Sequence, residues 1–178
     1  GLLVKSKIDL LLESVWTVAI TLMVGGVLLL FTDKIFRQER AEVHSVHDVK
    51  PLSALKIGLF QCLAFVPGVS RAAATIWGGL AMKLDQRTAT EFSFLLAFPT
   101  LGGATFLKAV KLVPHITDEQ WKMLLIGNIV SFVVGFISIR LFLQFVTKFG
   151  IKSFGYYRIV LGLIVVAALL SNMDIASL

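Results

Sequence analysis

Hydrophobic and polar positions alternate along this chain on the scale of whole helices. Long apolar runs separated by short polar segments are typical of proteins with several membrane-spanning helices, because each span needs about 20 predominantly apolar residues. The pattern predicts four spanning helices, at residues 15–31, 88–107, 123–146 and 156–170. The first contains the pair Gly25-Gly26, which favours close packing against a neighbouring helix.

A fifth apolar stretch, residues 52–82, is interrupted at Pro67-Gly68. The interruption leaves two pieces of about 14 residues, each too short to span a bilayer. Irregular backbone at membrane depth survives only where protein or a water-filled cavity satisfies its N–H and C=O groups. The stretch therefore predicts a re-entrant pair of half-helices that lines a binding site.

Composition agrees with a membrane protein. Hydrophobic residues make up 57% of the 178 residues and charged residues 16%, against about 25% charged in soluble domains. No linker or low-complexity run divides the chain, so one transmembrane domain over residues 1–178 is predicted, with a polar loop at residues 33–51. The fold class is all-α, as polytopic membrane helices with a re-entrant broken-helix pair.

The net charge of +6 does not indicate a nucleic-acid partner, because the Lys and Arg residues lie mostly in short loops between apolar spans. With a re-entrant pair, residues 33–51, 83–87 and 147–158 share one face and carry nine of these residues. The opposite face carries five, namely Lys5, Lys7, Lys108, Lys111 and Lys122. The first face is therefore predicted to be cytoplasmic, and the tail at residues 171–178 to lie outside.

The interruption itself predicts an anion site. Pro67-Gly68 ends one helix, and Ser70 is a good N-cap for the next. The N–H groups and the positive dipole end of a helix start favour an anion, and the Arg71 guanidinium can hold two phosphate oxygens. Thr75 follows Arg71 by four residues and shares its helical face. The alternative is a plain helix start with a snorkelling arginine, although an intramembrane arginine is costly enough to favour function.

Several other polar residues can be explained either by a structural role or by a functional one. Glu91 opens an apolar helix, where it could pair with Arg71, help to hold a cation, or only complement the helix dipole. His44 and His47 have metal-ligand spacing but lack further close ligands, which favours a solvated loop. Arg140 is predicted to snorkel toward the interface. Three neighbours resemble an interfacial anchor: Tyr156, Tyr157 and Arg158.

The residues around the turn resemble the undecaprenyl-diphosphate phosphatases, the bacitracin-resistance type of membrane phosphatase. The resemblance is detailed over residues 52–104 and weaker, though consistent in helix layout, to residue 170. It is carried by Ile-Gly-Leu-Phe-Gln-Cys-Leu-Ala at residues 57–64, Pro-Gly-x-Ser-Arg at 67–71, Ala-Thr-Ile at 74–76, Gly78-Gly79, and Glu-Phe-Ser-Phe-Leu-Leu-Ala at 91–97.

The resemblance implies one half of an inverted repeat with two re-entrant segments. It implies an enzyme that removes the terminal phosphate of undecaprenyl diphosphate at the outer face of the bacterial inner membrane, recycling the cell-wall lipid carrier and conferring bacitracin resistance. Gly68, Ser70, Arg71 and Thr75 match the family's phosphate-binding turn, with Arg71 and Ser70 as catalytic candidates, and Glu91 matches a recurrent position of unassigned role. A homodimer is left open.

This chain departs from the family pattern at several places. Ala72 and Ala73 follow Arg71 where the family has Ser-Gly, and Gln86 stands where the family has an arginine. The family's acidic motif and histidine segment do not occur, and their expected place is before Gly1. The resemblance implies a divalent cation, Mg or Ca, held mainly by that motif, so no metal ligands are assigned here. We therefore expect the C-terminal part of a phosphatase, with a lipid-phosphate transporter as the alternative, since broken helices also serve transport.

Overall fold

The computed structural model describes residues 14–171, and over that range the chain is helical, with short 3-10 turns and an isolated bridge between Val43 and Leu84. The predicted all-α class is confirmed. The α-helices are α2 (Val15–Leu30), α3 (Thr32–Ile35), α4 (Pro51–Gln61), α5 (Arg71–Ala81), α6 (Gln86–Leu112), α7 (Asp118–Phe149) and α8 (Lys152–Leu170). The predicted outer tail and the lysines at positions 5 and 7 lie almost wholly outside the described residues.

Three of the described helices are long and apolar enough to cross a membrane: α6 with its 3-10 extension, α7 and α8. This confirms a multi-pass membrane protein. Helix α2 is a shorter apolar helix, since its 16 residues rise about 24 Å against a hydrocarbon core of roughly 30 Å, so the fourth full span over residues 15–31 stays a prediction.

Helices α6 and α7 are longer than their apolar runs because polar caps set their first residues. The Asp85 carboxylate accepts from the Thr88 N–H at 2.7 Å, and Thr117 with Gln120 forms a capping box at the start of α7. Partial burial raises the pKa of Asp85, but hydrogen bonds from Thr88 and His44 outweigh that effect, so the pKa lies below its usual value. The Asp85 cap is therefore a charged one at neutral pH.

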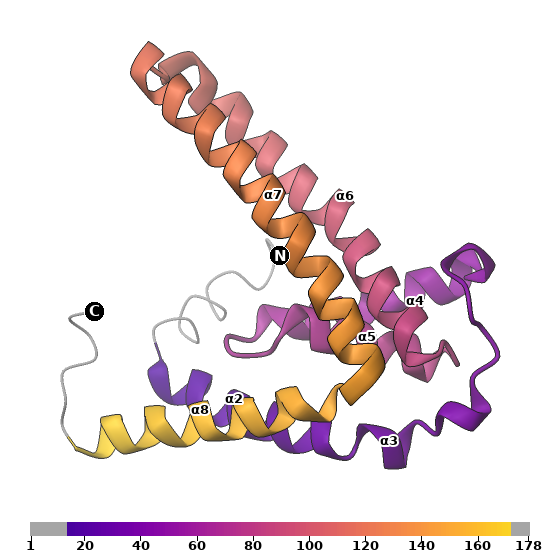
Figure 1. Cartoon of the computed structure of the whole chain (residues 1–178). Helices are drawn as coiled ribbons and strands as arrows, with labels where there is room; N and C mark the ends of the chain where they lie inside the picture. Colours follow the sequence, from indigo (N-terminus) through magenta and orange to yellow (C-terminus); the bar gives the residue numbers. More distant parts are fainter. Residues whose placement is uncertain (1–13, 172–178) are drawn as a thin grey trace.

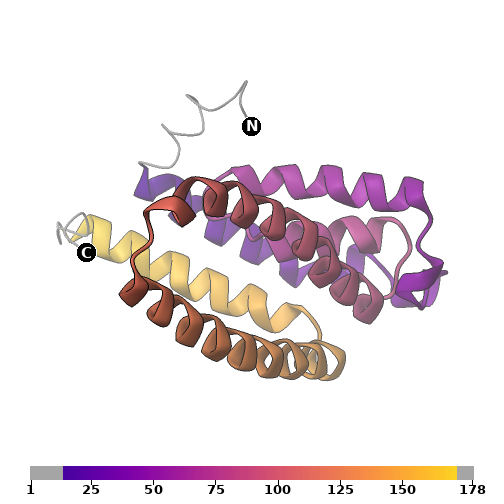
Figure 2. The same cartoon turned by 90° about the horizontal axis from the view of Figure 1, so that it is seen from above.

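Helices α2 and α8 form a close antiparallel pair (Figures 1 and 2). A Cβ added to Gly26 would lie 2.9 Å from the Gly155 carbonyl oxygen, and one added to Gly162 would lie 3.2 Å from that of Ala19. Small residues permit this backbone approach, as the Gly25-Gly26 pair predicts.

Helices α4 and α5 fold back on each other as a hairpin, and α5 packs on the first turns of α6. The buried core lies mainly between these elements, and its buried hydrophobic residues include Ile57, Ile76, Leu80, Leu84 and Ala89. The glycines of α5 permit this packing, since a Cβ on Gly78 would lie 2.9 Å from that of Phe60. The broken-helix pair is thus present as a hairpin, while its re-entrant position in a bilayer stays a prediction.

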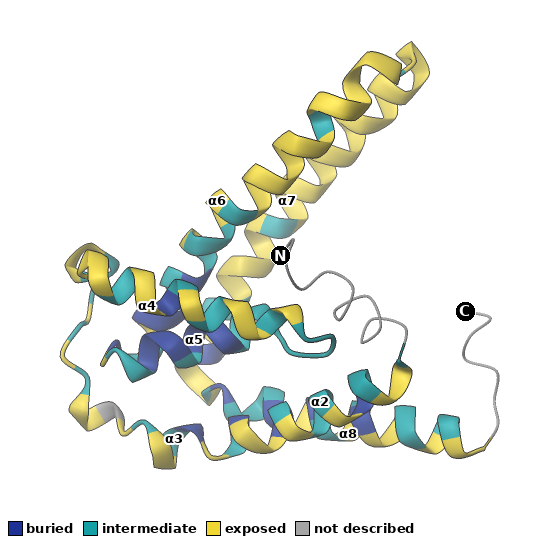
Figure 3. Cartoon of the chain, turned by 180° about the vertical axis from the view of Figure 1, so that it is seen from behind, coloured by how far each residue is buried: buried dark blue, intermediate teal, exposed yellow. Residues whose placement is uncertain are grey.

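Helices α6 and α7 project from this core as a long hairpin, and their outer parts are almost entirely exposed (Figure 3). The exposed residues are largely apolar, including Phe98, which is 84% exposed, and Phe132, which is 75% exposed. Side chains of this kind are stable against lipid tails rather than water. The hairpin therefore agrees with membrane insertion.

Candidate functional site

The turn between α4 and α5 is fixed by a glycine in the left-handed region. Gly68 has φ of +83°, a conformation that costs L side chains energy. A Cβ on Gly68 would lie 2.0 Å from the Thr21 hydroxyl oxygen and 2.9 Å from the carbonyl oxygen of Val18 on α2. The Thr21 hydroxyl donates to the carbonyl of Pro67 at 2.7 Å. Only glycine fits where the turn lies against α2.

The start of α5 has the predicted cap. The Ser70 hydroxyl oxygen accepts from the Ala73 N–H at 3.2 Å, which confirms Ser70 as the N-cap. Capping satisfies one of the N–H groups that lack partners in the first turn of a helix. The remaining ones, together with the helix dipole, give this end of α5 a positive potential.

Arg158 of α8 holds the turn from the other side. Its Nη2 donates to the carbonyl oxygen of Gly68 at 2.6 Å, and it reaches that of Thr21 at 3.4 Å. Arg158 is 9% exposed, so its interpretation as an interfacial anchor was wrong, whereas Tyr156 and Tyr157 are more than 60% exposed.

The inward direction of Arg158 could have been predicted from the glycines around it in the sequence. Gly155 and Gly162 stand three residues before and four after Arg158, so all three lie on one helical face. The glycines bring that face against α2, and Arg158 is directed inward with them. An arginine on the close-packed face of a helix cannot snorkel to the interface.

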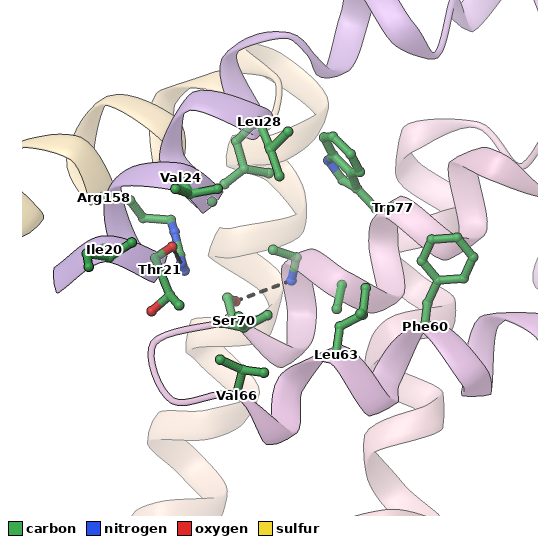
Figure 4. Close-up of a pocket in the computed structure, with 15 residues that line it drawn as sticks. Ile20, Thr21, Val24, Leu28, Phe60, Leu63, Val66, Ser70, Trp77 and Arg158 are labelled. Carbon is green, nitrogen blue, oxygen red and sulfur yellow. Dashed lines mark hydrogen bonds between the residues drawn. The ribbon is translucent and has the colours of Figure 1, made fainter. Parts of the chain in front are cut away.

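A cavity of about 430 Å³ lies between α2, the turn and α5 (Figure 4). In Figure 4, Arg158 and Thr21 come from α8 and α2, and Ser70 lies at the start of α5 across from them. These three residues supply the polar groups of the lining. The rest is apolar, apart from the Trp77 indole N–H: Ile20, Val24, Gly25, Leu28, Leu29, Phe60, Leu63, Val66, Val69, Ala73, Ala74 and Trp77. The cavity is thus an almost wholly apolar slot, and its cationic end is the Arg158 guanidinium, which is already bonded to the carbonyl oxygens of Gly68 and Thr21.

Arg71 and Thr75 do not line this cavity. Arg71 Nη1 donates to the Thr100 hydroxyl on α6 at 3.2 Å. Thr75 is 1% exposed, and its hydroxyl oxygen lies 2.6 Å from that of Ser93. Of the predicted phosphate-binding residues, Ser70 lines the cavity and Gly68 is bonded through its carbonyl to Arg158, whereas Arg71 and Thr75 are directed toward α6. Ligand contacts of Arg71 and Thr75 stay predictions.

Of the possibilities left open for Glu91, the ion pair with Arg71 does not form in the structure. Glu91 accepts from Arg87 Nε at 2.9 Å, one helical turn earlier on α6. Within residues 14–171, His, Cys, Asp and Glu side chains do not gather in any group of three that could hold a metal ion. The residues described here therefore do not fit a divalent-cation site by themselves.

The turn lies in a region of the chain that is similar to known proteins. The family described as bacitracin resistance protein BacA matches residues 1–164. The chain belongs to this family. Among BacA relatives, the undecaprenyl-diphosphatase of Porphyromonas gingivalis is 46% identical over 99% of this chain and 63% of its own length. Undecaprenyl-diphosphatases of Flavobacterium johnsoniae and Bdellovibrio bacteriovorus are 48% and 42% identical, over 92% and 98% of this chain.

The chain thus spans about 63% of the length of the first of these BacA relatives. The match includes the turn, α5 and the buried Arg158, which all lie within the aligned family region. The resemblance noted from the sequence is therefore confirmed at the level of the BacA family.

Proposed function

We propose that this chain holds the diphosphate end of undecaprenyl diphosphate in a BacA phosphatase that converts it to undecaprenyl phosphate. One observation carries the proposal: the broken helix places Ser70, the start of α5 and Arg158 at one end of an otherwise apolar cavity. Relatives that carry the name undecaprenyl-diphosphatase support the assignment of substrate and reaction.

The cavity suits an amphipathic ligand. Its walls are mainly aliphatic and aromatic side chains of α2, α4 and α5, which bind an isoprenoid chain by removing apolar surface from water. The cationic end adds charge-assisted hydrogen bonds for phosphate oxygens. A soluble diphosphate would gain only the charge-assisted hydrogen bonds and not the burial of apolar surface, so the cavity favours a lipid diphosphate.

The proposed role of Ser70, the start of α5 and the arginines is to stabilise the negative charge on the phosphate during hydrolysis. In hydrolysis, a water oxygen bonds to the terminal phosphorus, the bridging P–O bond breaks, and inorganic phosphate leaves undecaprenyl phosphate behind. Negative charge on the phosphoryl oxygens is stabilised by the start of α5 and by arginine side chains. Arg71 reaches the site by exchanging its neutral 3.2 Å contact with Thr100 for a phosphate.

Ser70 is better suited to binding than to nucleophilic attack. Its oxygen already accepts from Ala73, and activation would need a general base within hydrogen-bond reach. The hydrogen bonds of Ser70 in the described residues include no carboxylate or histidine. Its O–H remains able to donate to a phosphate oxygen.

We further propose that turnover needs a divalent cation, with ligands supplied beyond the residues described here. The proposed setting is the bacterial inner membrane, with the site open to the outer face, where the product re-enters the cell-wall lipid cycle. A homodimer stays a prediction.

The proposal is tested with a chimera in which this chain replaces the aligned region of the P. gingivalis relative. We expect the chimera to release phosphate from undecaprenyl diphosphate in detergent, and a chelator to abolish release. The chain alone should show little or no turnover. A chimera that binds the lipid diphosphate but releases no phosphate, with or without chelator, would instead favour a lipid-phosphate carrier.

A further inference from the structure

A second polar groove lies away from the cavity at the turn, where the start of α6 meets the end of α7. It has a volume of about 440 Å³ and shares no lining residue with that cavity. Its polar lining residues are Arg87, Glu91, Arg140, Gln144, Thr147 and Lys148. The two helix ends adjoin here, since a Cβ on Gly150 would lie 3.8 Å from the side chain of Gln86.

The groove has an excess of positive charge. It contains three cationic side chains and one carboxylate, and that carboxylate is engaged by Arg87 at 2.9 Å. Within residues 14–171, Arg140 and Lys148 have no ion-pair partner. Two basic groups thus face the groove without a matching anion.

Arg140 lies inside α7 beside exposed apolar side chains, where in a bilayer it either snorkels to the interface or is neutralised by an anion. It precedes the end of α7 at Gly150 by ten residues, which is about 15 Å along the helix. Its neighbours one turn deeper, Phe136 and Ile137, are 61% and 51% exposed, as expected for side chains facing lipid. An arginine at this depth is costly unless a counter-charge or water reaches it.

We propose that this groove binds the phosphate of an anionic glycerophospholipid between Arg140 and Lys148. Basic pockets between membrane helices at the end that carries the basic loops are suited to such headgroups. The lipid is favoured over a free anion because the groove continues into exposed apolar surface, with Leu95 56% exposed one turn beyond Glu91 on α6. Acyl chains lie along this surface while the phosphodiester neutralises the two basic groups.

The test is native mass spectrometry of the purified chain with phosphatidylglycerol, phosphatidylcholine or glycerol 3-phosphate as probe. We expect one phosphatidylglycerol to bind in preference to phosphatidylcholine. Arg140→Gln and Lys148→Gln should each weaken phosphatidylglycerol binding by about fivefold, the effect of one basic group near a membrane surface, and the double variant by more. Lys122→Gln, an exposed lysine at the opposite end of α7, should change it less than twofold.

Four results would overturn the proposal. Three are equal binding of phosphatidylcholine, equal losses in Lys122→Gln and Arg140→Gln, and unchanged binding in the double variant. The fourth is full competition by glycerol 3-phosphate, which would show a free-anion site rather than a lipid site. If Arg140→Gln does not fold by circular dichroism, Lys148→Gln at the exposed rim decides between these outcomes.

Discussion

Replacing Arg158 by methionine should release the turn that carries the proposed phosphate site. The change keeps a long unbranched side chain but removes the 2.6 Å hydrogen bond to the Gly68 carbonyl. Hydrogen bonds to charged groups contribute about 1.5–3 kcal/mol, and the 3.4 Å contact with Thr21 adds little. A loss of about 2 kcal/mol shifts the equilibrium constant between the ordered and the released turn by roughly thirtyfold.

The assay is phosphate release from undecaprenyl diphosphate by the chimera with the P. gingivalis relative. We expect kcat/KM to fall by up to about thirtyfold in Arg158→Met from release of the turn, with a larger fall if Arg158 also contacts a phosphate oxygen. Arg158→Lys keeps the charge but loses the planar guanidinium, so its loss should be intermediate. Tyr157→Phe, on the same helix but 63% exposed, is the matched control and should be unaffected.

An Arg158→Met variant with the same kcat/KM as the parent chimera would show that Arg158 does not hold the turn. An equal loss in Tyr157→Phe would also contradict that role, since the effect would then come from general disturbance of α8. Thermal unfolding separates a third case, in which Arg158→Met melts near the assay temperature. The assay is then repeated at a lower temperature, where the folded fraction is equal for all variants.

Three further predictions concern the scaffold. Gly68→Ala should lower the melting temperature and abolish turnover of the chimera, because positive φ costs about 1–2 kcal/mol and the added Cβ collides with α2. Gly102→Ala is the control, since open space surrounds Gly102, and it should change neither the melting temperature nor turnover. Thr75→Val should cost about 1–2 kcal/mol by leaving the Ser93 hydroxyl without its partner, and Ser93→Ala should recover part of that loss in the double variant. Asp85→Ala should cost about 1 kcal/mol in thermal melts at pH 7. Because the folded pKa of Asp85 is lowered, that difference should be full above pH of about 4 and shrink as pH falls through the folded pKa; a difference that persists unchanged in acid would contradict the charged cap.

Much of the turn was determined by local sequence. Pro67 and Gly68 form the turn that follows α4 and its 3-10 extension, Cys62–Phe65, and Ser70 caps α5, because each of these effects acts within a few residues. The pair between Arg87 and Glu91 is also local, one turn apart, although the possibilities stated for Glu91 did not include Arg87. The apolar runs predicted where the helices lie, because hydrophobicity is also a local property of the sequence. The first residues of α6 and α7 are set instead by the capping side chains of Asp85 and Thr117.

Contacts between distant segments were decided only by the tertiary structure. Arg158 and Gly68 are 90 residues apart, and no pattern near either one specifies their hydrogen bond. The directions of Arg71 toward Thr100 and of Thr75 toward Ser93 depend on how α5 packs on α6. The sequence by itself thus determined that a helix start with an anion-binding end lies inside an apolar region. Packing of α2 and α8 determined which basic side chain meets it, because close glycine contacts leave one inward direction for Arg158.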